Sequence, residues 1–316
     1  METPMIELTD VTKTFGRTKA LDGVSLTVER GTVLGLLGHN GAGKTTVVGI
    51  LSTLSLPTAG RARVAGLDVV AAPEEVRRRI GLTGQYASVD ETLSGYANLV
   101  LIGRLLGATR AQAAARAEEL LELFSLSEAA RRAAKGYSGG MRRRLDLAAS
   151  MVGHPDVIFL DEPTTGLDPA ARRGLWDVVR RLVRDGTTVL LTTQYLDEAD
   201  VLADAITVLG SGRVIASGTA QELKERVGRR SVSVRVRDTQ DRAQAESALR
   251  KAGLAPAYED DGLVLTMPVR DSTALAQVVR ATDEATVDLA GLEFSEPSLD
   301  DVYMALNHST ASQESR

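Results

Sequence analysis

A glycine-rich stretch between two apolar runs constrains the fold more than any other feature of this sequence. Val33–Leu37 before it has the pattern of a buried strand, and Val47–Leu51 after it reads as the first turns of a helix. Glycines let backbone N–H groups converge on an anion, and a helix N-terminus adds partial positive charge. Strand, glycine-rich turn and helix together indicate a phosphate-binding loop rather than a chance match in a glycine-rich chain. We call these residues the phosphate loop: Gly38, His39, Asn40, Gly41, Ala42, Gly43, Lys44, Thr45 and Thr46.

The side chains of the phosphate loop predict its ligand. Lys44 is expected to reach the β- and γ-phosphates of a nucleotide, and the Thr45 hydroxyl is expected to ligate Mg²⁺.

Asp161 and Glu162 follow an apolar run, Val157–Leu160, that is typical of a buried parallel strand. In open α/β sheets, ligands bind at the carboxyl ends of the strands, where the phosphate loop also lies. Asp161 is thus expected to hold Mg²⁺ through water, and Glu162 to polarise the attacking water. The alternative is that the two carboxylates only cap a following helix.

Bulk composition excludes several classes of protein. The chain of 316 residues has room for one large and one smaller domain. Its net charge of −5 argues against a broad nucleic-acid-binding surface, and the absence of cysteine excludes disulfides and thiol chemistry. Because no apolar run approaches about 18 residues, a membrane role is expected to come through a partner.

Two side chains each leave two interpretations open. Phe15, before a turn, either stacks on a purine ring or packs at the edge of the core. Gln85, in the loop after the predicted strand from Ile80, is either solvated, or it ligates Mg²⁺ or orients the attacking water.

Two further segments lie at the start of a predicted helix. Ser138-Gly139-Gly140, which we call the signature segment, forms either a plain N-cap or a second anion site. Arg142, Arg143 and Arg144 follow it. A run of three residues wraps around a helix, so we interpret these arginines as mostly a solvated face rather than a basic patch.

The pattern of elements predicts two domains and a tail. Residues 1–227 form an α/β domain with a helical subdomain over about 86–152, in which Thr109 and Gln112 form a capping box. Residues 228–308 read as βαββαβ, a ferredoxin-like α+β pattern whose last strand is expected at Thr286–Leu289. A helix is expected from Ser298 to Leu306. Residues 309–316 are polar and expected to be disordered.

Taken together, residues from about Met5 to Leu223 resemble the ATP-binding subunits of ABC transporters. The motifs that carry the resemblance occur in one order along the chain: the phosphate loop, Gln85, Tyr137–Met141, Asp161-Glu162, Gly166-Leu167-Asp168 and Thr192-Thr193-Gln194. Two longer segments resemble the daunorubicin/doxorubicin-resistance subfamily, Leu191–Asp200 and Glu296–Tyr303.

The resemblance implies a fold, ligands and partners. It implies a P-loop NTPase α/β fold that binds ATP and Mg²⁺, with Thr45, Gln85 and Asp161 at the metal. Two copies would bind head-to-tail around two ATP molecules, so that Ser138, Gly139 and Gly140 of one copy meet the phosphate loop of the other. Phe15 would then stack on adenine.

The resemblance also implies where the protein works. The helical insert, with Gln85 at its hinge, would contact a separate membrane permease at the cytoplasmic face of the membrane. Subfamily members power efflux of hydrophobic drugs and antibiotics. The alternative is a soluble ABC ATPase that acts on a macromolecular partner such as the ribosome or DNA. Such proteins usually carry two ATPase domains or long coiled coils, and neither is present here.

One position departs from the family pattern. ABC ATPases usually have a histidine in the switch loop, which here follows the predicted strand Thr188–Thr193. In this chain the residue is Gln194. Glutamine can donate a hydrogen bond to the γ-phosphate but cannot become cationic. We therefore expect Glu162 to be the general base and Gln194 to sense the phosphate.

Overall fold

The computed structural model describes residues 3–84, 89–227, 230–238, 241–258, 263–269, 272–295, 298–299 and 301–302. Its chain divides into two compact units, Met1–Ala220 and Gln221–Arg316. Helix α8 (Ala220–Val227) begins at this division, whereas the sequence places the boundary after residue 227. Each unit is described by itself below.

A six-stranded sheet forms the centre of the first unit. Its strand order is β10 (Arg213–Gly218), β9 (Ala205–Gly210), β3 (Val33–Leu37), β8 (Thr188–Thr193), β7 (Val157–Asp161) and β6 (Ile80–Thr83). Neighbouring strands are parallel except β10, which is antiparallel to β9. Every residue of β3, β7 and β8 is buried, as expected for apolar strands that are covered on both faces.

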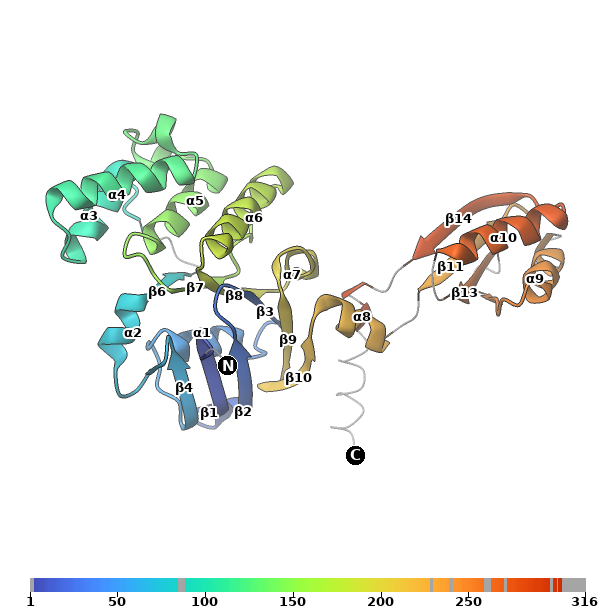
Figure 1. The fold of residues 1–316 in the computed structure, drawn as a ribbon, viewed down its shortest axis with the longest axis horizontal. Coiled ribbons are helices and arrows are strands. Elements are labelled where there is room, and N and C mark those ends of the chain that lie inside the picture. The colour runs from blue at the N-terminus through green and yellow to red at the C-terminus, as the bar shows by residue number, and fades with distance from the viewer. Residues whose placement is uncertain are drawn as a thin grey trace. The chain divides into compact units, whose positions relative to one another are not determined.

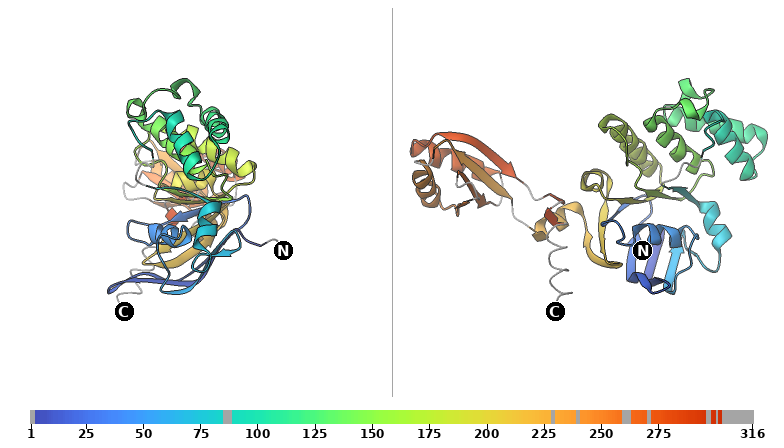
Figure 2. Two further views of the ribbon diagram at one scale, coloured as in Figure 1. Left: turned by 90° about the vertical axis from the view of Figure 1, so that its left-hand side faces the viewer. Right: turned by 180° about the vertical axis from the view of Figure 1, so that it is seen from behind.

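An antiparallel sheet covers one face of this central sheet. It contains β2 (Thr18–Val28), β1 (Ile6–Phe15), β4 (Ala59–Val64) and β5 (Leu67–Asp68), in that order. Helix α1 (Lys44–Leu51) shares one hydrophobic core with residues of both sheets. In Figures 1 and 2 the antiparallel strands lie below the parallel sheet. The phosphate loop is thereby anchored at the junction of two sheets.

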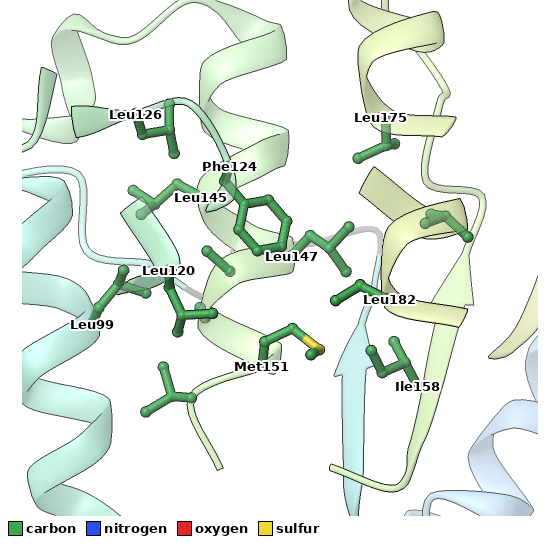
Figure 3. Packing of buried hydrophobic residues seen from close by; sticks show 14 of the residues in the cluster. Leu99, Leu120, Phe124, Leu126, Leu145, Leu147, Met151, Ile158, Leu175 and Leu182 are labelled. Carbon is green, nitrogen blue, oxygen red and sulfur yellow. The ribbon is translucent and has the colours of Figure 1, made fainter. Parts of the chain in front are cut away.

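Helices cover the opposite face. They are α3 (Gly95–Leu105), α4 (Arg110–Leu123), α5 (Gly139–Ser150) and α6 (Pro169–Arg184), with the short helices η1 (Ser127–Ala129) and η2 (Ala134–Gly136) between them. Figure 1 shows them above the sheet, and Figure 3 shows Phe124 surrounded by leucines and by Met151 at their common core. The predicted capping box is confirmed, because Thr109 and Gln112 each accept a hydrogen bond from the backbone of the other. Helices α2 (Pro73–Arg79) and α7 (Leu196–Leu202) complete the unit.

The second unit has the ferredoxin-like topology that the sequence predicts. The order of elements is β11 (Ser231–Val236), α9 (Asp241–Lys251), β12 (Ala257–Tyr258), β13 (Val264–Pro268), α10 (Thr273–Glu284) and β14 (Leu289–Ser295). The sheet order is β12-β13-β11-β14, and every pairing in it is antiparallel. Its core lies between the sheet and the two helices.

One strand prediction in this unit is wrong. The last strand begins at Leu289, whereas the sequence places it at Thr286–Leu289. Thr286 has a φ of 55° and donates its N–H to the carbonyl of Asp283, so it closes a turn after α10. This left-handed conformation is incompatible with a strand. The helix expected from Ser298 to Leu306 and the expected tail lie mostly outside the described residues.

In the part of the chain that the structure describes, no helix combines the length and apolar character needed to cross a bilayer.

Candidate functional site

The phosphate loop connects β3 to α1, as predicted. Gly43 is the residue before α1 and has a φ of 110°, which favours glycine. A Cβ at Gly43 would lie 2.7 Å from the Leu21 side chain and 2.9 Å from the Ala20 carbonyl oxygen. At Gly38, a Cβ would lie 2.7 Å from the carbonyl oxygen of Leu209. Close backbone packing therefore requires glycine at both ends of the loop.

Lys44 folds back over the loop. Its side chain is only 5% exposed, and Nζ donates hydrogen bonds to the carbonyl oxygens of Gly38 at 2.6 Å and His39 at 3.3 Å. Burial lowers the pKa of the Lys44 ammonium group, and the carboxylates of Glu162 and Asp161 oppose this shift. The cation thus lies inside the loop, beside the acidic residues that the sequence also selects.

Asp161 ends β7 and is held from two sides. Thr192 Oγ1 donates a hydrogen bond to Asp161 Oδ1 at 2.5 Å, and Thr45 Oγ1 lies 3.4 Å from Oδ2. The parallel register of β7 and β8 pairs Asp161 with Thr192 directly. A buried carboxylate and a hydroxyl therefore converge at the carboxyl edge of the sheet, where the sequence predicts a magnesium site.

Glu162 leaves the strand in a strained conformation. Its φ is 49°, and its N–H donates to the carbonyl and hydroxyl oxygens of Thr192 at 3.0 and 3.2 Å. The side chain points back to the loop, with Oε1 3.9 Å from Lys44 Nζ and Oε2 3.5 Å from Thr165 Oγ1. Non-glycine residues persist in this backbone region when their surroundings hold them there, which is common at active sites.

The sequence also assigns Phe15, Gln194 and Gln85 to the site. Phe15 ends β1 and is 52% exposed, and Lys13 Nζ lies 4.7 Å from its ring centroid. Gln194 is exposed immediately after β8. Gln85 lies outside the described residues.

The signature segment begins α5. Ser138 is its N-cap and accepts a hydrogen bond from the N–H of Met141. The segment lines a pocket of about 520 Å³ together with Gly166 and Asp168, and the described lining residues include none from the phosphate loop. Within one chain, this pocket therefore joins the signature segment to the loop before α6.

The interpretation of the arginine run as a solvated face is wrong. All three side chains are half-buried, and Arg144 donates to the carbonyl of Phe124. Arg143 points inward, where it donates to backbone carbonyls at the end of β7. No local pattern distinguishes it from Arg142, which pairs with Glu91 near the surface.

Two other residues of this region, Thr192 and Glu198, receive no role of their own from the sequence. Thr192 could have been found from the strand-end rule, since β8 ends beside β7. Glu198 is completely buried on α7, where Trp176 Nε1 lies 3.3 Å from its Oε1. Burial raises the pKa of the Glu198 carboxyl, and the Thr193 and Trp176 side chains offset part of this shift.

Comparison with known proteins places this geometry in a family. The ABC transporter family profile matches residues 21–165, and the profile of the DrrA1-3-like ATP-binding protein C-terminal domain matches residues 218–306. The daunorubicin resistance ATP-binding protein DrrA3 of Streptomyces coeruleorubidus is 54% identical over 93% of each chain. The chain belongs to the ATP-binding subunits of ABC transporters. The daunorubicin/doxorubicin resistance ATP-binding protein DrrA of Streptomyces peucetius is 48% identical, over 99% of this chain and 95% of its own.

Solved structures agree with this assignment to the ABC ATP-binding subunits. A dimeric ATP-binding cassette in a post-hydrolysis state with ADP and Pi is 26% identical with a TM-score of 0.62, over 68% of this chain and 98% of that chain. A nucleotide-free cassette from an ABC transporter gives 25% identity and a TM-score of 0.65, over 71% and 94%. The predicted P-loop NTPase fold is confirmed, and this ABC subunit is a nucleotide-binding ATPase.

Proposed function

We propose that this ABC subunit hydrolyses MgATP in a head-to-tail dimer and thereby powers efflux of a hydrophobic drug or antibiotic through a separate membrane subunit. The observation that carries the transport proposal is similarity to drug-resistance ATP-binding proteins over nearly the full chain, including the C-terminal domain. The alternative of a soluble ATPase with a macromolecular partner has no comparable support.

The residues of the site fit the proposed chemistry. Lys44 would exchange its loop carbonyls for the β- and γ-phosphates, which are stronger acceptors for an ammonium group. Glu162, with its carboxylate at the mouth of the loop, would hold and polarise the attacking water. Its backbone is already held in place, so hydrolysis requires little rearrangement at this residue.

The donor set also fits Mg²⁺. Thr45 and Asp161 offer hard oxygen ligands 3.4 Å apart, at a depth where water and phosphates can supply the others. Among the residues that the structure describes, no group of three His, Cys, Asp or Glu side chains forms a closed metal cage. When bound, Mg²⁺ neutralises the charge of the β- and γ-phosphates. The proposal also assigns Gln85 to this metal and Gln194 to the γ-phosphate.

The signature segment supports the head-to-tail dimer. Ser138 and Gly139 are exposed, although they begin a helix with free N–H groups. A Cβ at Gly140 would lie 2.8 Å from that of Ala171, so its own chain requires glycine there. At Gly139 a Cβ would meet nothing within 4 Å, so the chain itself does not require this glycine. Close approach of a second copy's nucleotide would explain it.

A groove on the helical subdomain supports contact with a membrane subunit. Its volume is about 930 Å³, and α2, β6, α3, α4 and α5 contribute to its walls. Leu101, Leu105 and Leu106 are exposed on and just after α3, with Leu105 77% exposed. Exposed leucines at the rim of a groove are typical of protein-binding surfaces. We assign this surface to the permease, which would hold the ATPase at the cytoplasmic face of the membrane.

Substitution of the general base tests the ATPase part of the proposal. Glu162→Gln should abolish turnover yet retain ATP, and the variant should then elute as a dimer in ATP during size-exclusion chromatography. Asp177→Asn, at an exposed carboxylate on α6, is the matched control. It should hydrolyse ATP at the wild-type rate and elute as a monomer once the ATP is consumed. Wild-type turnover by Glu162→Gln would refute the assignment of the base.

The transport part needs the membrane partner. We expect a neighbouring reading frame to encode a protein with about six apolar segments of ~20 residues. Expressing both subunits in a drug-sensitive host should raise drug tolerance, and Glu162→Gln should remove this protection. Equal protection by the Glu162→Gln pair would show that ATP hydrolysis by this subunit does not drive efflux.

A further inference from the structure

The guanidinium group of Arg143 contacts the backbone of two separate segments, one after β6 and one at the end of β7. Nε donates to the carbonyl of Pro163 at 2.7 Å, and Nη1 donates to that of Gly84 at 2.8 Å. Nη2 lies 3.2 Å from the carbonyl oxygens of both Asp161 and Glu162. One side chain on α5 therefore bonds the segment that leaves β7 and the segment that leaves β6.

These contacts use the particular shape of arginine. Its planar fork carries five N–H donors in fixed directions, whereas lysine is a point charge on a flexible stem. Burial lowers the pKa of the Arg143 guanidinium, and the carboxylates of Asp146, Asp161 and Glu198 oppose this. Removing a charged group from water costs free energy unless its donors are paired. The four backbone carbonyl acceptors of Arg143 supply this pairing.

The contacts bear directly on the strained residue of the site. Glu162 has its N–H fixed by Thr192 and its carbonyl fixed by Arg143, so both sides of this residue are held from neighbouring elements. Loss of the second anchor would let the backbone at φ 49° relax toward a less strained region. The carboxylate would then move away from Lys44 while the phosphate loop itself stayed intact.

We propose that Arg143 is a positioning residue for ATP hydrolysis, which fixes the backbone of Glu162 and links it to α5 and to Gly84 after β6. The inference rests on the proposed role of Glu162 as general base. Because α5 begins with the signature segment, movement of that helix would reach Glu162 through a single guanidinium group. The same guanidinium group bonds Gly84, so a movement of α5 would shift Gly84 and Glu162 together.

A split between turnover and ATP affinity tests the role. Arg143→Gln should lower kcat roughly 10- to 100-fold, because a displacement of about 1 Å at a catalytic group can cost that much. The affinity for a fluorescent ATP analogue should change less than about three-fold, since Lys44 and the loop are untouched. Arg142→Gln is the matched control from the same turn and should keep wild-type kcat. Wild-type kcat in Arg143→Gln, or an equal loss of affinity and turnover, would overturn the proposal.

Arg143→Lys separates positioning from simple folding. Lysine keeps the charge and much of the packing but cannot form the fork, so the melting temperature should stay near wild type while kcat still falls. If Arg143→Gln fails to fold, this variant decides the question, and wild-type kcat in it would overturn the positioning role.

A double variant connects the result to Glu162. If Arg143 acts through Glu162, adding Arg143→Gln to Glu162→Gln should lower the residual rate no further. Full activity of Glu162→Gln alone would refute the proposed base itself. An inactive Glu162→Gln together with additive losses in the double variant would refute only the proposal for Arg143.

Discussion

The ammonium group of Lys44 lies 3.9 Å from the Oε1 atom of Glu162, and both side chains are largely shielded from water. The two residues are 118 positions apart in the sequence. Lys44 belongs to the phosphate loop, and Glu162 follows β7. Lys44 Nζ also donates to the loop carbonyls of Gly38 and His39. ATP phosphates would compete for the same cation, so we expect nucleotide binding to change the contact between Lys44 and Glu162.

Removal of the Lys44 cation should abolish useful turnover. Lys44→Ala should lower kcat at least about 100-fold, as loss of one preorganised electrostatic group does in other active sites. ATP affinity should fall as well, because the phosphates lose a charge-assisted donor. Steady-state hydrolysis and isothermal titration measure the two effects. Lys251→Ala in the second unit should match wild type, and unchanged hydrolysis by Lys44→Ala would contradict the site assignment.

Thr192 should control the magnesium dependence of hydrolysis. Thr192→Val leaves Asp161 Oδ1 without its buried donor, which should cost about 1–3 kcal/mol of stability. The freed carboxylate should also raise the Mg²⁺ concentration needed for half-maximal hydrolysis. Thr192→Ser keeps the hydroxyl and should restore both properties. If Val and Ser variants showed the same magnesium dependence, Thr192 would have no part in orienting Asp161.

Glu198 should make stability depend on pH. Its raised folded-state pKa means that the folded chain keeps a proton that the unfolded chain loses above the ordinary value of 4.5. The resulting stabilisation is present below that pH and is lost as pH rises through the folded-state pKa. The glutamine of Glu198→Gln does not titrate. The free energy of unfolding of this variant minus that of wild type should therefore increase as pH rises above 4.5.

Urea denaturation between pH 4 and pH 8 measures this difference. Glu29→Gln, at an exposed carboxylate, should show no comparable trend. If the free energy of unfolding of Glu198→Gln minus that of wild type stayed constant or decreased as pH rose, the result would be inconsistent with the raised pKa of Glu198.

Phe15 should contribute to ATP affinity by stacking. Phe15→Ala should weaken binding roughly 10-fold, because stacking of one base on an aromatic ring is worth about 1–3 kcal/mol. Phe15→Trp should retain affinity, and GTP should show a similar loss with Phe15→Ala because every base has a π-face. Binding is best followed by titration calorimetry with ATP and GTP. Wild-type affinity of Phe15→Ala would return Phe15 to the alternative of edge packing.

Gln194 should sense the γ-phosphate without titrating. Gln194→Ala should reduce kcat, whereas wild-type hydrolysis should show no ionisation near pH ~6.5 that depends on this residue. Gln194→His should introduce such an ionisation into the pH–rate profile. Full activity of Gln194→Ala would remove the sensor role, and identical profiles for wild type and Gln194→His would show that the position does not contact the reacting groups.

Much of the fold follows from local patterns. The continuous apolar runs at β3, β7 and β8, the capping box of α4 and the glycine spacing of the phosphate loop each have one physical interpretation. Chain order then placed Lys44 and Asp161 at one sheet edge, since parallel strands share that edge. The missed strand at β14 shows the limit, because a left-handed turn at Thr286 interrupts a segment with good strand composition.

The sequence by itself determined the chemistry of the site, because the phosphate loop and the strand-end carboxylates are contiguous motifs whose residue types dictate what they bind. Only the tertiary structure decided which side chains hold those motifs in place. Arg142, Arg143 and Arg144 are the same residue type. The orientation of α5 relative to β7 directs Arg143 to the backbone carbonyl of Glu162. Thr192 likewise acquires its role from the register of β8 with β7. Such contacts join residues distant along the chain, and their geometry arises from packing rather than from any local pattern.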